Sequence, residues 1–468
     1  MSEWLQRSVT DLSTDLVAGK FSAEELMRET LRRIGETQSS LNCFTSLRDE
    51  EAVLAEARSA DARIADGSGR ALEGIPLGVK DLEDAEGMVT SYGSVPFKDN
   101  LATRDSLQTE RLRAAGAIVV GKTNTPEFGY TAISKNLLFG ESRNPWNLDR
   151  TPGGSSGGSA AGIAGGVVSL ATASDGGGSV RIPASVTGCF GLKVSYGRIP
   201  HGPHDLWVMD DTSVHGPLTR SVADAALHLD VAAGPHPLDP NSLPAQGLSY
   251  RAVLDDLPDG LRAAYSPDLG YAVVQSDVAE IAEAAAGLLP EMGISLEALG
   301  TGLPEPGGAW GMSGAWEMLA QLHSLLPEHE EEFGRSFIGG VKAGSRMTPE
   351  RWGKMRRLRS EINRFCADVF ERYDVLLTPT VPYDAPPARG PFLAELEGRP
   401  QPAANYGSFT MPFNLSWHPA ATVRAGLSSA GLPVGLQIVG PRHRDDLVLQ
   451  VARAFERHTD CFGTWPTV

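Results

Sequence analysis

The 468-residue sequence predicts an α/β protein built on a large mixed β-sheet with helices covering both faces. Short runs that are apolar on both faces recur along the chain, and segments with helical periodicity such as SLQTERLRAAG separate them. Strands of this kind are typical of a sheet buried between two helical layers. The runs lie at IPLGVK (75–80), AIVVGK (117–122), VVSLAT (167–172), CFGLKV (189–194), VLLTPT (375–380) and PVGLQIVG (433–440).

The first 65 residues predict a layer of helices. Leu5, Val9, Leu12 and Leu16 recur at helical spacing, so one face of this segment is apolar. The segment SAEE, which starts at Ser22, has the form of a capping box and marks the start of a second helix. We expect residues 1–65 to cover one part of the sheet.

Two separated segments, 66–236 and 351–468, supply the predicted strands and form a single α/β core. A helix is expected over 350–372. The intervening segment, 237–350, starts with residues rich in proline and polar side chains and continues with an irregular pattern over 300–350. We therefore interpret 237–350 as a variable insertion into one core, not as an independent domain.

Charge and composition exclude several classes of function. The formal net charge is −17, and acidic surfaces repel nucleic acids and anionic membranes, so we expect neither as a partner. No stretch has the length of a signal peptide core or of a membrane span, which favours a cytoplasmic location.

The cysteines and histidines give no indication of a metal site. Four widely spaced cysteines without a CxxC pair indicate reduced, buried side chains, not a zinc site or a disulfide framework. The nearest thing to a histidine cluster, His201 and His204 in HGPHD, is flanked by proline and glycine and indicates a loop. We expect neither a metal nor a cofactor.

Two stretches rich in glycine and serine need a separate explanation: TPGGSSGGSAAG (151–162) and ASDGGGSVRIPA (173–184). Glycine is used densely where the backbone must adopt a conformation, or approach another atom, that a Cβ would forbid. Neither stretch contains the GK[ST] ending of a phosphate loop, and neither matches GxGxxG. Nucleotide binding is therefore disfavoured.

The first stretch also matches the GxSxG pattern of a nucleophile elbow, in the frames 153–157 and 154–158. An elbow requires an apolar strand that leads directly into the serine. The preceding residues, NPWNLDRTP, are polar and broken by proline. This alternative, with His418 or His443 as the base, is thus disfavoured.

A third interpretation combines both stretches with GVKD at the end of the first predicted strand. Ser179 follows Gly176, Gly177 and Gly178, whose N–H groups can converge on one oxygen, so a nucleophile would sit in its own oxyanion hole. Burial at the strand end would lower the pKa of Lys80, so that its neutral amine could act as the base. A serine could then relay the proton between Lys80 and Ser179. Lys80 alone would suggest a surface lysine, but its occurrence with Ser179 favours catalysis.

These residues resemble the motifs of the amidase signature family, and the resemblance covers most of the chain outside the insertion. The matching segments are GVKD (78–81), NTPEFG (124–129), RNPWNLDRTPGGSSGGSAA (143–161), SDGGGSVRIPA (174–184), GLKVSYGRIP (191–200), HGPLTRSVADAA (215–226), LLTPT (376–380) and GLPVGLQIVGP (431–441).

The resemblance implies a role for each residue of the site. Ser179 corresponds to the nucleophile that forms the acyl-enzyme, and Lys80 to the base. Ser155 corresponds to the bridging serine, held by a cis peptide bond after Gly154; on its own it would suggest a helix N-cap. Among supporting residues, Ser156 is expected either to hydrogen-bond Lys80 or to cap a helix, and the pair Asp175 and Arg181 to orient the glycine loop.

The implied reaction is hydrolysis of the C–N bond of a linear carboxamide, a small molecule with an aryl or hydrophobic acyl group; carbamates and esters also remain open. The insertion 237–350 would shape the pocket, and four tryptophans indicate an apolar wall: Trp207, Trp310, Trp316 and Trp417. Two positions depart from the family pattern, Gly176 in the oxyanion loop and Arg424 late in the core. A homodimer is the oligomer that the family suggests.

Two alternatives compete with an independent amidase. The first is the glutamine-hydrolysing subunit of a tRNA-dependent amidotransferase, which usually has SIRQPA at the nucleophile, with glutamine where this chain has Ile182. The second is an inactive family member that serves as a binding protein. The presence of Lys80, Ser155 and Ser179 together disfavours it.

Overall fold

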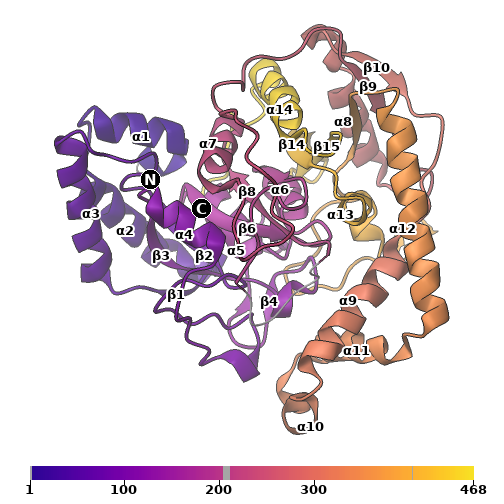
Figure 1. Ribbon diagram of the computed structural model, residues 1–468, viewed down its shortest axis with the longest axis horizontal. Coiled ribbons are helices and arrows are strands. Elements are labelled where there is room, and N and C mark those ends of the chain that lie inside the picture. The colour runs from indigo at the N-terminus through magenta and orange to yellow at the C-terminus, as the bar shows by residue number, and fades with distance from the viewer. Residues whose placement is uncertain (1–2, 204–210, 403) are drawn as a thin grey trace.

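The computed structural model describes residues 3–203, 211–402 and 404–468. Within these residues eleven strands form one mixed sheet in the order β1-β3-β2-β6-β8-β7-β14-β15-β11-β9-β10 (Figure 1). The predicted α/β fold is therefore confirmed. The strands are β1 (Phe44–Leu47), β2 (Pro76–Lys80), β3 (Ile118–Thr123), β6 (Leu170–Asp175), β7 (Phe190–Lys193), β8 (Val214–Thr219), β9 (Arg262–Tyr265), β10 (Ser295–Ala298), β11 (Val375–Pro379), β14 (Ala420–Leu427) and β15 (Pro433–Val439).

Two short hairpins lie apart from this sheet. They pair β4 (Lys135–Asn136) with β5 (Gly140–Glu141), and β12 (Glu395–Leu396) with β13 (Arg399–Pro400). The apolar runs predicted as strands correspond to β2, β3, β7, β11 and β15 within one residue at each end. The run over 167–172 is displaced, because β6 begins only at Leu170 and continues to Asp175.

The helices pack around the sheet. They are α1 (Val9–Val17), α2 (Ala23–Leu41), α3 (Glu50–Ala65), α4 (Leu107–Ala114), α5 (Gly157–Ala164), α6 (Arg181–Thr187), α7 (Val222–Ala232), α8 (Ser276–Ala286), α9 (Gly307–Leu322), α10 (Leu326–His329), α11 (Arg335–Ala343), α12 (Pro349–Phe370), α13 (Met411–Leu415) and α14 (Asp445–Thr459). The helix expected over 350–372 is α12. The capping box at Ser22 and Glu25 opens α2 as predicted.

Alternate residues of β11 show that both faces of the sheet are covered. Val375 and Leu377 pack in a cluster with side chains of α7 and α14, whereas Leu376 packs in a cluster with side chains of α12. Successive side chains of a strand point to opposite faces, so helices lie on each side of β11. This explains why Val375, Leu376 and Leu377 are all apolar.

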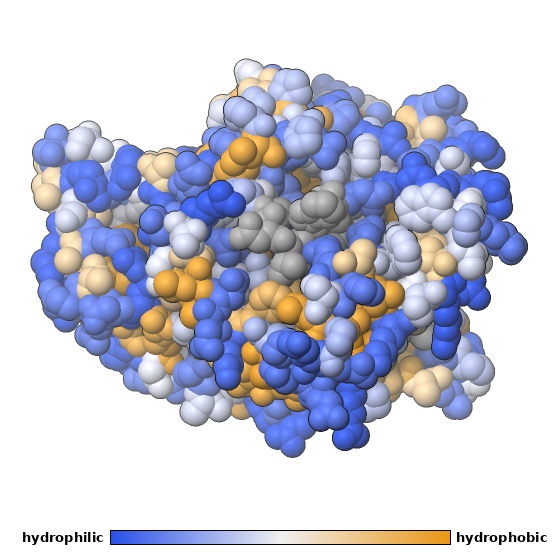
Figure 2. Space-filling view, turned by 60° about the horizontal axis from the view of Figure 1, so that its bottom comes forward, coloured by the Kyte–Doolittle hydropathy of each residue, from blue (hydrophilic) through white to orange (hydrophobic). Residues whose placement is uncertain are grey.

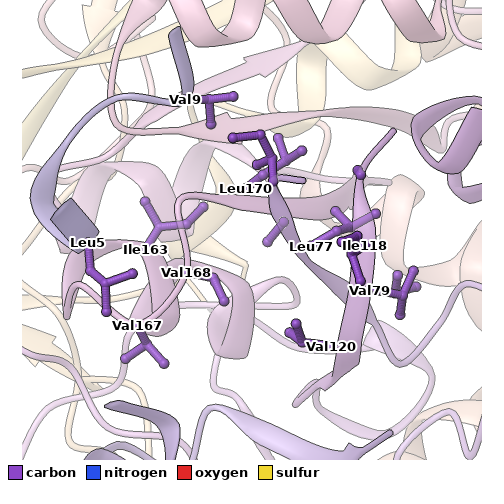
Figure 3. Packing of buried hydrophobic residues seen from close by; sticks show 14 of the residues in the cluster. Leu5, Val9, Leu77, Val79, Ile118, Val120, Ile163, Val167, Val168 and Leu170 are labelled. Carbon is purple, nitrogen blue, oxygen red and sulfur yellow. The ribbon is translucent and has the colours of Figure 1, made fainter. Parts of the chain in front are cut away.

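The N-terminal helices pack against one end of the sheet. Leu5 and Val9 enter the same buried cluster as Leu77 of β2 and Ile118 of β3 (Figure 3). The segment also contributes a strand that the sequence did not indicate, because β1 pairs antiparallel with β3 at the sheet edge. Residues 1–65 are thus more than a separate helical layer.

The segment 237–350 has two structural parts. Its strands β9 and β10 pair parallel with each other, and β9 also pairs parallel with β11, so both belong to the main sheet. The expectation of an irregular pattern over 300–350 was wrong, because α9, α10 and α11 form there. Glycines recur through this region and weaken its helical signal. The boundaries of the insertion stay a prediction.

Arg424, whose effect could not be interpreted from the sequence, fastens the C-terminal segment to the sheet. It is buried, its Nη1 donates to the carbonyl oxygen of Thr464 at 2.7 Å, and its guanidinium lies over the rings of Trp146 and Trp465. The position therefore has a packing role here.

Hydrophilic residues cover most of the face in Figure 2, and hydrophobic side chains gather there mainly below the centre of the view. No helix in the described ranges combines the length and the apolar character needed to cross a membrane. The four cysteines are buried with free thiols, as predicted.

Candidate active site

The strand order brings Lys80 beside the second glycine stretch. Lys80 ends β2 and Asp175 ends β6, and these two strands are parallel neighbours. Because the carboxyl ends of parallel strands meet at one edge of a sheet, residues almost a hundred positions apart become adjacent. The glycine loop 176–178 follows β6 at this edge.

The Lys80 ammonium nitrogen is surrounded by serine hydroxyls. Nζ lies 2.8 Å from Oγ of Ser155, 2.8 Å from Oγ of Ser156 and 2.9 Å from Oγ of Ser174. Lys80 is completely buried. Three hydroxyls fix the amine in place, yet no carboxylate of the described residues pairs with it directly.

This environment changes the basicity of the lysine. Burial lowers the pKa of Lys80 to about 7, although the negative charges of Glu83 and Asp175 oppose the change. At neutral pH a large fraction of the amine is therefore unprotonated and able to accept a proton. The pKa of Lys80 is therefore lowered by burial, as expected from its place at the end of a buried strand, and its role as the base stays a prediction.

The first glycine stretch, residues 151–162, places Ser155 and Ser156 directly before α5. The peptide bond between Gly154 and Ser155 is cis, as the resemblance implied. Ser156 occupies the N-cap position of α5, but its side chain makes no capping hydrogen bond and contacts Lys80 instead. Close packing explains the glycines: a Cβ on Gly158 would lie 2.3 Å from the backbone nitrogen of Asn124.

The second glycine stretch is held by the carboxylate of Asp175. Its oxygens accept hydrogen bonds from the backbone N–H of Gly178 at 2.7 Å and of Val180 at 3.1 Å. They also accept from Nε and Nη2 of Arg181 at 3.0 and 2.9 Å. The loop that carries Ser179 is thus tied at both ends to one side chain.

Asp175 and Arg181 form a fully buried ion pair. Burial alone would raise the pKa of Asp175, but the charge and hydrogen bonds of Arg181 and a hydrogen bond from Asn414 hold it well below its ordinary value. Arg181 in turn donates to Oε1 of Gln437 and Oδ1 of Asn414. The pair therefore orients the loop, which is the role that the resemblance implied.

The predicted oxyanion donors differ in availability. The N–H of Gly178 already donates to Asp175, which leaves the N–H groups of Gly176, Gly177 and Ser179 as candidates. The carbonyl oxygens of Gly176 and Gly177 are fixed by Nε1 of Trp310 at 3.0 Å and by Oγ1 of Thr410 at 2.6 Å. A Cβ on Gly177 would lie 2.3 Å from Cζ2 of Trp310, so only glycine fits there.

Ser179 lies where two cavities meet. The first is narrow and has both polar and apolar groups in its wall, which includes Ser155, Ser174, Glu83, His201 and His215. The second encloses about 700 Å³ and is largely apolar; its wall includes Tyr130, Ile182, Trp310, Phe392, Tyr406 and Met411. Gly129, Gly177, Ser179 and Trp310 border both cavities.

Of the four tryptophans predicted to line a pocket, Trp310 does so. Trp316 and Trp417 are 43% and 39% exposed and line neither cavity, so their assignment was wrong. Trp207 and His204 lie outside the described residues. His201 is in a loop as predicted, but this loop reaches the first cavity.

Sequence reasoning missed several residues of the site. Ser174 precedes Asp175 in the quoted stretch, but nothing in its local pattern indicated a contact with Lys80. Glu83 and His215 come from distant segments and meet only in the folded chain, where Nδ1 of His215 lies 3.5 Å from Oε2 of Glu83. Glu83 lies only three residues after Lys80, so the sequence could have indicated a carboxylate near the proposed base.

The alternative of a nucleophile elbow finds no support in the geometry. Ser155 follows a loop, not a strand, and neither His418 nor His443 borders the two cavities. Nδ1 of His418 instead lies 2.9 Å from Oγ of Ser416. The residue facing Ser155 is Lys80.

Comparisons with known proteins agree with this geometry. Residues 25–449 match the model of the amidase family. An acylamidase from Rhodococcus erythropolis is 34% identical, over 97% of this chain and 95% of its own. The crystal structure of a bacterial aryl acylamidase of the amidase signature family superposes with a TM-score of 0.92 at 27% identity, covering 99% of each chain.

A further relative comes from a different functional group. One of the subunits of the glutamyl-tRNA(Gln) amidotransferase from Geobacillus thermodenitrificans is 33% identical, over 97% of each chain. Both kinds of relative share the family, and the family match spans nearly the whole chain. The chain therefore belongs to the amidase family, the amidase signature enzymes, and is a hydrolase of amide C–N bonds.

Proposed function

We propose that this chain hydrolyses amides of hydrophobic or aryl acyl groups through an acyl-enzyme on Ser179, without a partner protein. The observation that carries the proposal is a fully buried lysine with a pKa near 7 that is hydrogen-bonded to Ser155 at the wall of the cavity that also contains Ser179. A neutral amine in this position is a general base, and a serine beside it can pass a proton.

The proposed reaction begins with proton transfer from Ser179 through Ser155 to Lys80. As Oγ of Ser179 forms a bond to the carbonyl carbon, the N–H groups of Gly176, Gly177 and Ser179 stabilise the oxyanion. The proton then returns through Ser155 to the nitrogen as the C–N bond breaks. Water attacks the resulting ester by the same route, giving the acid and free Ser179.

The apolar cavity supports the choice of substrate. Its wall combines Ile182, Phe392 and Met411 with aromatic side chains, which favour burial of an apolar group over a charged one. The acylamidase and aryl acylamidase among the similar proteins are consistent with this chemistry. Carbamates and esters of similar shape remain candidate substrates because their carbonyl group fits the same machinery.

The amidotransferase reading is less favoured. Ile182 occupies the position where that subunit usually has glutamine, and this side chain borders the apolar cavity. Glutamine would place a charged ammonium and carboxylate in the active site, for which an apolar wall provides no partners. An inactive binding protein would have no need for the contacts that link Lys80 to three hydroxyls.

An assay of the purified chain alone tests the proposal. We expect hydrolysis of an anilide with a hydrophobic acyl group, with a kcat/KM at least about tenfold above that for glutamine, since burying the charged ends of glutamine costs more than about 1.4 kcal/mol. An aliphatic primary amide and an aryl carbamate complete the panel. Release of each amine, or of ammonia, is the measurement.

The comparison with glutamine decides between the two kinds of relative. Cleavage of glutamine alone, or cleavage that starts only after an amidotransferase partner is added, would show that the amidotransferase reading is correct. Cleavage of none of the four compounds would support the inactive alternative.

The pKa of Lys80 predicts how the rate depends on pH. Only the neutral amine accepts a proton, so kcat/KM for an uncharged anilide should rise with pH, level off above about 7 and fall about tenfold per unit below it. Burial sets this value, and Glu83 and Asp175 act against it. Initial rates from pH 5.5 to 9 measure the profile; a flat profile would contradict a lysine base.

A further inference from the structure

The loop that carries the proposed oxyanion hole is held through its carbonyl oxygens. Each of the four carbonyl groups from Asp175 to Gly178 accepts a hydrogen bond. The donors are, in chain order, Nδ2 of Asn414 to Asp175 at 2.8 Å, Nε1 of Trp310 to Gly176 at 3.0 Å, Oγ1 of Thr410 to Gly177 at 2.6 Å and the backbone N–H of Ile182 to Gly178 at 2.7 Å. These donors set the direction of every peptide group in the loop.

A fixed carbonyl group also directs the N–H group of the next residue. In a trans peptide the C=O and the N–H point in opposite directions, and the cis bonds of the described residues lie elsewhere in the chain. Trp310 therefore turns the N–H of Gly177 away from its indole ring. This N–H is one of those that remain for an oxyanion, because the N–H of Gly178 donates to Asp175.

Trp310 differs from the other three donors in its origin. Ile182 lies on α6, and Thr410 and Asn414 lie at the start of α13 and within it, so these donors belong to the α/β core. Trp310 lies on α9, in the segment 237–350. That segment thus contributes a hydrogen bond to the loop that carries Ser179, in addition to a cavity wall.

The indole ring is packed between the loop and the core. A Cβ on Gly177 would lie 2.3 Å from Cζ2 of Trp310, so the ring is in direct contact with the loop. The ring also packs against the buried cluster that includes Phe409 and Phe413. Because the ring is held from two directions, its Nε1 has a fixed place from which to orient the carbonyl group of Gly176.

We infer that Trp310 is a positioning residue of the oxyanion hole. Its Nε1 holds the carbonyl group of Gly176 so that the N–H of Gly177 points at the oxygen of the bound substrate. The inference rests on the proposed function, because it takes Ser179 as the nucleophile. Trp310 acts through the loop and not on the oxyanion itself, since its own N–H is used on Gly176.

Two substitutions separate the hydrogen bond from the ring. Trp310→Phe removes the N–H and shortens the side chain, whereas Trp310→benzothienylalanine exchanges the N–H for sulfur and keeps the shape of the indole. The second substitution therefore removes the donor and leaves the cavity walls in place. We expect it to lower kcat for an anilide by about tenfold to hundredfold, less than the loss of an oxyanion donor itself, since the N–H of Gly177 stays but is no longer held.

Two ketones of nearly the same shape show whether this loss lies in the oxyanion hole. Oγ of Ser179 adds to the carbonyl carbon of phenylethyl trifluoromethyl ketone, and its proton passes through Ser155 to Lys80. The electron pair of the C=O bond moves to the oxygen, which gives a bound hemiketal oxyanion. Phenylethyl methyl ketone is not activated for this addition. The ratio of the two inhibition constants therefore measures how well the oxyanion hole is formed.

In both Trp310 variants the preference for the trifluoromethyl ketone should fall by the same factor as kcat. The benzothienylalanine variant should bind the methyl ketone within about threefold of the wild-type affinity, because its cavity walls are unchanged. Trp316→Phe is the matched control, since Trp316 lies on the same helix, is 43% exposed and borders neither cavity. It should keep the wild-type preference.

Two results would overturn the inference. The first is a benzothienylalanine variant with unchanged kcat and an unchanged preference between the ketones. The second is an equal loss of affinity for both ketones, which would leave Trp310 as part of a cavity wall only. In either case the acylation route stands. If the wild-type chain cleaves no anilide and binds both ketones equally, the proposed function itself fails, and the inference fails with it.

Discussion

Replacement of Ser179 by alanine is expected to lower kcat for anilide hydrolysis by about 10⁴-fold to 10⁶-fold, the loss typical of removing a nucleophile. No other hydroxyl takes its place, because Ser155 and Ser156 are bound to Lys80. The anilide should still bind, since the walls of both cavities are unchanged. Steady-state rates and displacement of a bound competitive inhibitor measure the two effects separately.

Ser185→Ala is a suitable control for this experiment. Ser185 is also a buried serine, on α6 close to Ser179 in sequence, but it borders neither cavity. We expect its kcat to stay within about threefold of the wild-type value, as for a substitution that leaves the reacting groups intact. Full activity in Ser179→Ala together with loss of activity in Ser155→Ala would instead support the nucleophile elbow.

Replacement of Lys80 by methionine is expected to lower kcat/KM by about 10³-fold to 10⁴-fold, because the reaction loses its general base. Methionine has a similar length and is apolar, so the buried space stays filled. The rise of the rate with pH near 7 should also disappear, which a purely structural defect would not cause. A pH profile of the residual activity measures this effect.

Lys193→Met provides the matched control. Lys193 is likewise fully buried, burial lowers its pKa to about 7, and its Nζ donates to the carbonyl oxygen of Val194 at 3.0 Å. It borders neither cavity, so the variant should keep the pH profile of the wild type. If Lys193→Met lost the profile and Lys80→Met kept it, the assignment of the base would be wrong.

The sequence by itself predicted the parts of the protein that depend on local pattern. Runs apolar on both faces identified most strands of the sheet, and a serine three residues before a glutamate located the start of α2. The two stretches rich in glycine and serine, with the lysine at the end of a strand, indicated Lys80 and Ser179 as candidate residues, and the resemblance to the amidase signature family added Ser155. The glycines themselves are required by tertiary packing, because a Cβ on Gly158 would meet Asn124 and a Cβ on Gly177 would meet Trp310.

Features that depend on which segments become neighbours in the fold were harder to predict from the sequence. The contact between Lys80 and Ser174 exists because β2 and β6 are parallel neighbours in the sheet. The sequence of either segment by itself does not indicate that the two strands pair. Five strands of the sheet, β1, β8, β9, β10 and β14, were missed, and two of them, β1 and β10, are four-residue edge strands with few apolar residues. The helical region over 300–350 was missed because its glycines lower the intrinsic helix propensity, which packing then overrides.

The sequence therefore determined the chemistry that the site has available, and the tertiary structure decided how that chemistry is arranged. Burial lowers the pKa of Lys80, so part of its amine is neutral near pH 7, and the pairing of β2 with β6 brings this amine to the hydroxyls of Ser155, Ser156 and Ser174. The physical reason is that pKa, hydrogen bonding and cavity shape depend on distances between residues far apart in the chain. Those distances are fixed by packing of the whole sheet and its helices.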